Sequence, residues 1–142
     1  MLNAFAAVVG QKAQGCWLGY GSVLFLEFGE LHPLEHQTHP RGEWSLSSAR
    51  ILWRIEQDDS VLGGSEDDRP TMEAAIEYIN GNTLVAGELL EASGDSVLTF
   101  SGRVVLKTFV LSSAEDSRWH LTLADGSHVS LGTARSGMGT VS

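Results

Sequence analysis

The feature that most constrains this chain is a set of three short landmarks that occurs twice in the same order. The first set is Gly10-Gln11-Lys12, Ser22-Val23-Leu24 and Trp44-Ser45-Leu46, and the second is Gly81-Asn82-Thr83, Ser96-Val97-Leu98 and Trp119-His120-Leu121. The two members of each pair lie 71, 74 and 75 residues apart. Such self-similarity predicts two related structural units whose loops differ slightly in length.

The length of the chain predicts that these units share one core. The 142 residues are typical of a single domain, whereas a unit of about 70 residues would be marginally stable alone. We therefore expect residues 1–142 to form one domain that contains an internal repeat, about 1–70 and 71–132. Residues 133–142 are rich in Gly and Ser and have little to bury, so we expect a mobile tail there.

One helix is predicted over residues 70–80. Its apolar side chains recur at the spacing that places them on one helical face, and they are Met72, Ala75, Ile76 and Ile79. Gly81 follows, where a left-handed residue can end the helix. The 71-residue shift moves the same stripe to residues 1–8, which predicts a shorter, more buried helix. A strand is the alternative for residues 1–8, because β-branched residues end that segment.

The remaining pattern is typical of hairpins. Residues 11–18 and 22–28 form one candidate pair and residues 83–91 and 96–101 another, each with glycine in the connection. We therefore predict an α+β fold that is mainly antiparallel β, with two pseudo-symmetric halves sharing one core and one or two short helices packed on the sheet.

The clearest strand is residues 119–123, in which apolar and polar residues alternate. A three-residue loop over 124–126 would pair Trp119 with Leu131 and Leu121 with Val129, which keeps the apolar side chains on one face. The polar face would then carry His120 and His128 as diagonal neighbours, within reach of a shared ligand. Solvent-facing histidines without a specific role are the simpler interpretation. A related element is expected in the first unit, formed by Trp44, Leu46, Ile51, Trp53 and Ile55.

Charge limits the classes of partner. Nine Lys and Arg residues against eighteen Asp and Glu residues give a net charge of −9, which disfavours nucleic-acid binding. Residues 56–68 contain six acidic side chains and no basic one, and they are interpreted as a linker between the units. A solvated charge run is the simpler hypothesis, and a contact surface for a basic protein is the functional one. The acidic candidates are Glu56, Asp58, Asp59, Glu66, Asp67 and Asp68.

A histidine-rich segment suggests metal binding. His32, Glu35 and His36 match the H-x-x-E-H pattern of a zinc-peptidase family, and His39 lies nearby. That chemistry needs both imidazoles on one face of a stable helix, and Pro33 confines any helix to its own start. A polar loop is therefore the preferred interpretation, with adventitious Zn²⁺ or Ni²⁺ binding as the alternative.

The sequence offers no other signature of catalysis or of a cofactor. Cys16 is the single cysteine, and its apolar flanks indicate a buried free thiol rather than a nucleophile. The opening residues lack the basic segment of a signal peptide. The longest nearly apolar stretch, residues 16–26, is too short to cross a bilayer as a helix. We therefore expect a cytoplasmic protein in a reducing compartment.

The repeated glycine hairpins and the late W-x-L strand resemble those of small acidic bacterial proteins in uncharacterised, immunity-protein-like families. Gly10, Gly81, Trp44 and Trp119 carry the resemblance together with the two Ser-Val-Leu landmarks. The resemblance implies a non-enzymatic protein-binding module that neutralises a basic toxin by occlusion. The alternative is a small-molecule or metal-binding protein, enzymatic or not, with its site between the two halves. A homo-oligomer joined through sheet edges is a third expectation.

Overall fold

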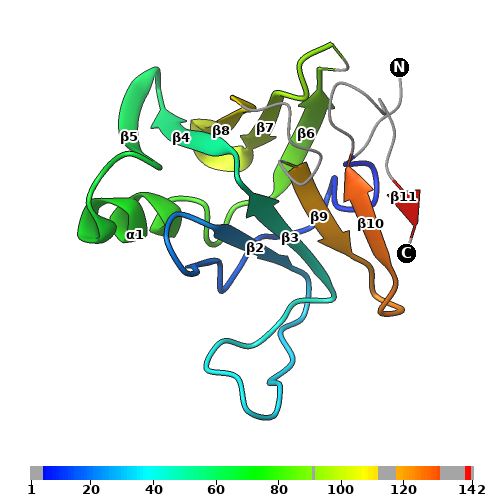
Figure 1. The fold of residues 1–142 in the computed structure, drawn as a ribbon. Coiled ribbons are helices and arrows are strands. Elements are labelled where there is room, and N and C mark those ends of the chain that lie inside the picture. Colours follow the sequence, from blue (N-terminus) through cyan, green and yellow to red (C-terminus); the bar gives the residue numbers. More distant parts are fainter. Residues whose placement is uncertain (1–4, 91, 112–117, 132–139, 142) are drawn as a thin grey trace.

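The computed structural model describes residues 5–90, 92–111, 118–131 and 140–141. Their strands form two antiparallel sheets, and one helix, α1 (Arg69–Glu77), packs against strands of both sheets (Figure 1). The six-stranded sheet has the order β1 (Trp17–Leu18), β2 (Leu24–Phe28), β3 (Trp44–Ala49), β9 (Arg118–Thr122), β10 (His128–Leu131) and β11 (Thr140–Val141). The five-stranded sheet has the order β5 (Ser60–Gly64), β4 (Leu52–Gln57), β8 (Val104–Phe109), β7 (Ser96–Phe100) and β6 (Leu84–Leu89). The predicted class, mainly antiparallel β with a packed helix, is confirmed.

The connectivity of the chain is the same in the two units. In the first unit, β1, β2 and β3 are neighbours in one sheet, and β4 and β5 then join the other sheet. In the second unit, β6, β7 and β8 are neighbours in that other sheet, and β9 and β10 return to the first. Each unit therefore completes the sheet that the other unit begins. A two-fold relation between the units in three dimensions stays a prediction.

Backbone pairing near the first landmark is reciprocal between the units. Gly10 donates its N–H to the carbonyl of Leu84 at 2.8 Å, and Gly81 donates to the carbonyl of Ala13 at 2.7 Å. Both glycines have a φ near +90° and open space where a side chain would stand, so the left-handed backbone is what requires glycine. Gly10 and Gly81 therefore hold equivalent positions in the pairing.

The predicted correspondence of Trp44 with Trp119 is wrong. Trp53 of β4 is the residue that matches Trp119 of β9, because each lies on the strand that crosses to the other sheet. Both indoles are almost fully buried, and their N–H groups donate to the Ser22 carbonyl (2.7 Å) and to the Ser96 hydroxyl (3.1 Å). Trp44 lies on β3 opposite Phe28 and is only partly buried.

The related element expected from Trp44 to Ile55 is divided between the two sheets. Strands β3 and β4 follow each other in the chain but belong to different sheets, as Figure 1 shows. The change of sheet occurs at Arg50, whose φ of +56° turns the chain sharply. An alternating pattern is common to every half-buried strand and does not specify its pairing partner.

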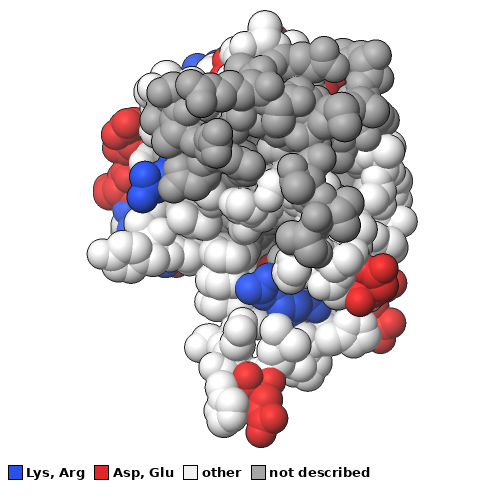
Figure 2. Space-filling view, turned by 45° about the vertical axis from the view of Figure 1, so that its right-hand side comes forward, with Lys and Arg blue, Asp and Glu red and all other residues white. Residues whose placement is uncertain are grey.

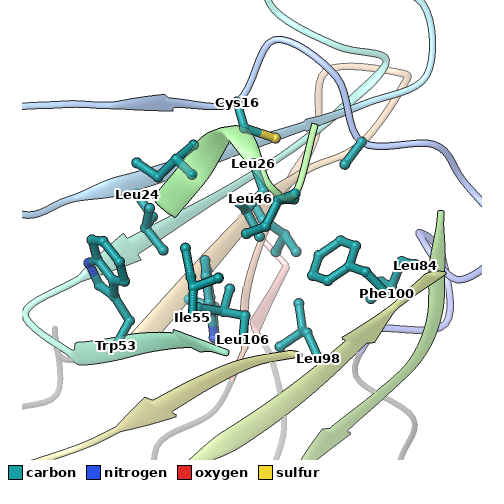
Figure 3. Close-up of a cluster of buried hydrophobic side chains, with 14 of the residues drawn as sticks. Cys16, Leu24, Leu26, Leu46, Trp53, Ile55, Leu84, Leu98, Phe100 and Leu106 are labelled. Carbon is teal, nitrogen blue, oxygen red and sulfur yellow. The ribbon is translucent and has the colours of Figure 1, made fainter. Parts of the chain in front are cut away.

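The core lies between the two sheets and is formed by both units. Figure 3 shows side chains of the six-stranded sheet facing those of the five-stranded sheet. Phe28 of β2 and Phe100 of β7 stack across this interface with centroids 6.5 Å apart. Fully buried members of the cluster are Leu24, Leu26, Leu46, Ile55, Leu84, Leu98 and Leu106. This single cluster matches the expectation that the units share one core.

Helix α1 forms where its apolar spacing predicts it. The Asp68 carboxylate accepts the N–H of Thr71 at 2.9 Å and caps the first turn. The predicted apolar stripe is buried, and a turn leads from the helix to Gly81, whose φ is +91°. The other side of the helix remains exposed, which matters for the site described below.

The last hairpin has the predicted register. Leu121 pairs with Val129 and Trp119 with Leu131, and Gly126 adopts a φ of +89° in the turn. The chain start differs from its prediction: residues 5–10 form hydrogen-bonded turns rather than a helix or a strand, and residues 1–4 lie outside the described part. Of the expected tail, residues 140–141 instead form β11, while 133–139 and 142 are not among the described residues.

The acidic segment 56–68 is not a linker. Strand β4 extends to Gln57, a tight turn at Asp58 and Asp59 follows, and β5 returns along β4. The φ angles of the two turn residues are +50° and +66°, as this kind of two-residue hairpin requires. Strand β5 then packs on α1, and a side chain at Gly63 would meet Ala75 at 2.9 Å. The segment is therefore an integral part of the fold.

Candidate functional site

The most distinctive open feature is a hollow of about 350 Å³ between β1 and α1, which we call the β1–α1 hollow. Residues 15–18 and 39–40 line one side, and residues of α1 together with Asn80 line the other. The lining residues on the helical side are Arg69, Glu73, Ile76, Glu77 and Asn80. The hollow therefore lies between the two halves of the chain, where pockets commonly form.

The side chain of Arg69 closes one end of the hollow. Its guanidinium donates to the carbonyls of Leu18 at 2.8 Å and Gly19 at 3.1 Å. Glu73, one turn further along α1, lies 3.9 Å from the Arg69 Nε. This ion pair is a loose one, because the two side chains are 49% and 59% exposed. Arg69 thus stabilises the free edge of β1, and the carboxylate of Glu73 stays open to solvent.

The side chain of Asn80 closes the opposite end. Its carbonyl oxygen accepts the N–H of Cys16 at 2.8 Å, and its amide nitrogen donates to Glu77 at 3.3 Å. Glu77 is one turn from Glu73 on the same helical face, and it is also exposed. Two carboxylates therefore line the hollow between the fixed groups at its ends.

An aromatic stack forms the wall on the side of the first unit. The imidazole of His39 stacks on the indole of Trp17 with centroids 4.2 Å apart, and Trp17 stacks on Phe25 at 3.9 Å. The guanidinium of Arg41 lies 5.4 Å from the Phe25 ring. The Trp17 N–H donates to the buried carboxylate of Glu27 at 3.0 Å, which fixes the indole.

Cys16 lies at the base of the hollow but is not activated. Burial, together with the nearby charges of Glu27 and Glu77, raises the pKa of its thiol to about 12, and hydrogen bonds only partly oppose this. The thiol is therefore protonated at neutral pH. The structure supports the interpretation of Cys16 as a buried free cysteine.

The histidine-rich loop does not gather the predicted metal candidates at one point. The backbone of His32 pairs with that of Arg41, and His39 is held on the aromatic stack. His36 lies 3.8 Å from Glu35, and both side chains are 89% exposed. Within the described ranges, no three His, Cys, Asp or Glu side chains are placed to hold a metal ion.

The acidic candidates at the two ends of the segment are used within the fold. Glu56 forms ion pairs with Arg54 at 2.7 Å and with Lys107 at 3.2 Å. Burial raises the pKa of this carboxyl, but the hydrogen bonds and charges of the two cations outweigh that effect and hold the pKa below its usual range. Asp68 caps α1, and its hydrogen bond to Thr71 lowers the pKa of its carboxyl.

The other acidic candidates differ in how free they are. Asp58 pairs with Arg103 at 3.0 Å, and Asp67 accepts the N–H of Gly64 at 2.8 Å. Asp59 and Glu66 are exposed. The segment therefore carries less uncompensated charge than its composition indicates.

A second hollow, of about 470 Å³, lies between the long β2–β3 loop and the β9–β10 turn. Ser45, Thr122 and His128 form one cross-strand row on its floor, and Thr122 shares a hydrogen bond with His128 at 3.0 Å. Glu30 and Glu43 line it together with Arg41, so charges of both signs are mixed. The predicted diagonal arrangement of His120 and His128 is present, since Ser130 pairs with His120 in the next row.

The sequence analysis missed the β1–α1 hollow. The exposed side of α1 was visible as the polar half of an amphipathic helix, with Glu73 and Glu77 one turn apart. No pattern in the sequence showed that Trp17 and His39, 22 residues apart, would stack opposite that helix. The long-range contact between β1 and α1 had to be seen in three dimensions.

Comparison with protein-family models, with curated proteins and with solved structures found no match. Among the described residues, no helix is both long enough and apolar enough to cross a membrane.

Proposed function

We propose that this protein is a non-enzymatic binding module whose β1–α1 hollow receives a basic protein partner. The observation that carries the proposal is the pair of exposed carboxylates, Glu73 and Glu77, beside an open hollow. Arg69, the one Lys or Arg among the described residues that line the hollow, is directed to the carbonyls of Leu18 and Gly19. The rim therefore favours a cationic ligand.

The charge of the whole chain supports this proposal. A net charge of −9 accelerates the approach of a basic protein and slows that of an acidic one. Figure 2 shows acidic and basic groups in separate small clusters on one face rather than a continuous acidic field. Charge of this kind guides the encounter, and a shaped site such as the hollow then provides specificity.

Neutralisation of a toxin would follow from this binding by occlusion. An immunity-like protein needs no catalytic group, because covering the functional surface of the partner is sufficient. In the β1–α1 hollow the one cysteine is protonated and buried, which supports binding rather than nucleophilic catalysis. The toxin as partner and the cytoplasm as location are parts of the proposal that come from the sequence.

The test starts with the identification of a partner by affinity capture and continues with the purified pair. Reversal of the rim charges in Glu73→Lys/Glu77→Lys should slow association at least tenfold and reduce its dependence on salt. The matched control is Glu30→Lys/Glu88→Lys, which changes the net charge equally at exposed positions that do not line the hollow. An equal loss in both variants would show that net charge alone acts, and would contradict a site at the hollow.

A small-molecule ligand in the same hollow is the second candidate function. The volume of about 350 Å³ is within the usual range for ligand pockets, about 300–1,000 Å³. A ligand of this kind would remain bound to the purified protein without a partner. Native mass spectrometry that detects a stoichiometric small molecule, lost in the Glu73→Lys/Glu77→Lys variant, would favour this function.

A further inference from the structure

We infer that the β1–α1 hollow is a receptor for one guanidinium group, the side chain of a single arginine on the partner. This inference rests on the proposed function and specifies its chemistry. It depends on the size of the hollow, on the hydrogen-bonding groups at the edge of β1, and on the spacing of the two carboxylates.

The volume of the hollow suits a single side chain. About 350 Å³ lies at the lower end of the range for small-ligand pockets, about 300–1,000 Å³. An extended side chain fits within this space. The partner therefore contributes a side chain to the hollow, and the rest of its surface lies outside.

The edge of β1 is partly occupied by side chains of the same protein. An edge strand normally offers free N–H and carbonyl groups to an extended peptide. Here the Cys16 N–H is bound by Asn80, and the carbonyls of Leu18 and Gly19 are bound by Arg69. An added strand would have to displace these bonds, which favours recognition through a side chain.

The spacing of the carboxylates favours a guanidinium over an ammonium. Glu73 and Glu77 are related by one helical turn, which places their Cβ atoms about 6 Å apart. A guanidinium has five N–H donors in a planar fork and can reach two carboxylates at once, whereas an ammonium is a compact point charge. Trp17 is stacked on both faces, by His39 and by Phe25, so the outer face of the His39 ring is the aromatic surface that a guanidinium could stack on.

Other classes of ligand fit less well. A phosphate or carboxylate would be repelled by Glu73 and Glu77, since Arg69 is already directed to backbone carbonyls. A metal ion lacks the required set of ligands among the described residues. A purely apolar group would displace water from the polar side chains at both ends of the hollow without offering hydrogen bonds in return.

The experiment uses the full chain and the probe Nα-acetyl-L-arginine amide. The indole N–H resonance of Trp17 in a ¹H–¹⁵N spectrum reports binding, because this ring forms the wall of the hollow. We expect a saturable shift with a dissociation constant in the millimolar range, as is typical for one side chain. The acetyl-lysine amide should bind several-fold more weakly, and the citrulline analogue, which has the same shape without the charge, should not bind.

The matched variants are Glu73→Gln/Glu77→Gln and, as the control, Glu30→Gln/Glu88→Gln. The first variant should bind the arginine probe at least tenfold more weakly than the wild-type chain, and the control variant should bind it with unchanged affinity. All four positions are exposed, so the dispersion of the spectrum should show intact folds. An equal response to arginine and citrulline in the wild-type chain would overturn the inference even if a variant failed to fold.

The same data separate this inference from the proposed function. If the arginine probe does not bind but Glu73→Lys/Glu77→Lys still slows association with a basic partner, the guanidinium receptor is wrong and the basic partner site stands. If the probe binds but reversal has no effect on the partner, the receptor stands and the proposed function is wrong.

Discussion

Replacement of Trp119 by alanine should be among the most destabilising changes in the chain. The side chain is 1% exposed, contacts the Phe5 ring edge to face at 6.4 Å and donates to Ser96 at 3.1 Å. Truncation of a buried tryptophan costs about 3–5 kcal/mol in unfolding free energy, and the lost hydrogen bond accounts for about 1 kcal/mol of this. Urea denaturation followed by far-UV circular dichroism measures the effect. Tryptophan fluorescence is not suitable as the signal, because the substitution removes one of the fluorescent side chains.

A phenylalanine at the same position separates packing from hydrogen bonding. Trp119→Phe keeps a ring against Phe5 but removes the N–H donor, and the Ser96 hydroxyl keeps its hydrogen bond to Thr108. We expect a loss of about 1–2 kcal/mol. The total free energy of unfolding of a domain is about 5–15 kcal/mol. Trp119→Phe should therefore stay folded and measurable even if Trp119→Ala does not.

The controls are two other tryptophans, Trp53 and Trp44, which differ in how deeply they are buried. Trp53→Ala should cost as much as Trp119→Ala, because Trp53 is 2% exposed and makes the equivalent kind of indole hydrogen bond. Trp44→Ala should cost no more than about 2 kcal/mol, since Trp44 is only partly buried. A Trp44→Ala loss as large as that of Trp119→Ala would refute the correspondence of Trp53 with Trp119.

Three further predictions concern other parts of the fold. Gly87→Ala should destabilise the chain by about 1–3 kcal/mol in urea denaturation, because its new Cβ would stand 2.8 Å from the Cβ of Phe5. The thiol of Cys16 should resist iodoacetamide at pH 8 in the folded protein and react in urea, since burial raises its pKa to about 12; rapid labelling of the folded chain, followed by mass spectrometry, would contradict this. The pKa of Glu56 is lower in the folded state than its ordinary value of 4.5, so its stabilising contribution is present above that pH and is lost as the pH falls through the folded value. Glu56→Gln should therefore flatten the acid side of the stability profile, and an unchanged profile would contradict the ion pairs with Arg54.

Local elements of this fold could be predicted from the sequence because local chemistry determines them. The spacing of Met72 and Ile76 defines a helical face, and Asp68 and Gly81 mark its ends. In the last hairpin, only one register keeps Trp119 and Leu131 on the same side of the sheet. Each of these predictions needed no information from beyond about fifteen residues.

The exchange of strands between the sheets could not be predicted in the same way. Residues 44–49 and 52–57 both alternate apolar and polar positions, and this pattern is equally compatible with a hairpin or with two sheets. The landmark at Trp44 looked similar to Trp119 in sequence, but pairing across the whole chain makes Trp53 its counterpart. Register over such separations is a property of the packed sheets.

The candidate acids show the same limit for the site. Composition marks residues 56–68 as acidic, but the cation that pairs with Glu56 from the neighbouring strand is Lys107, 51 residues away. Conversely, Glu73 and Glu77 lie on the exposed side of α1, and nothing in the sequence indicates that β1 lies beside them. A charged side chain is available to a binding partner only if no opposite charge within the fold already pairs with it.

The hollow lies at a place where the two units differ. Gly87 of β6 pairs with Leu98 of β7, and Leu18 of β1 pairs with Leu24 of β2, so each faces the last residue of a Ser-Val-Leu landmark. At Gly87 the space is occupied, because the Phe5 side chain lies directly on the backbone. Beside Leu18 the hollow, which Ile76 also lines, remains open to solvent. Two terminal strands with similar pairing therefore differ in what covers them, and the one in the six-stranded sheet leaves room for a ligand.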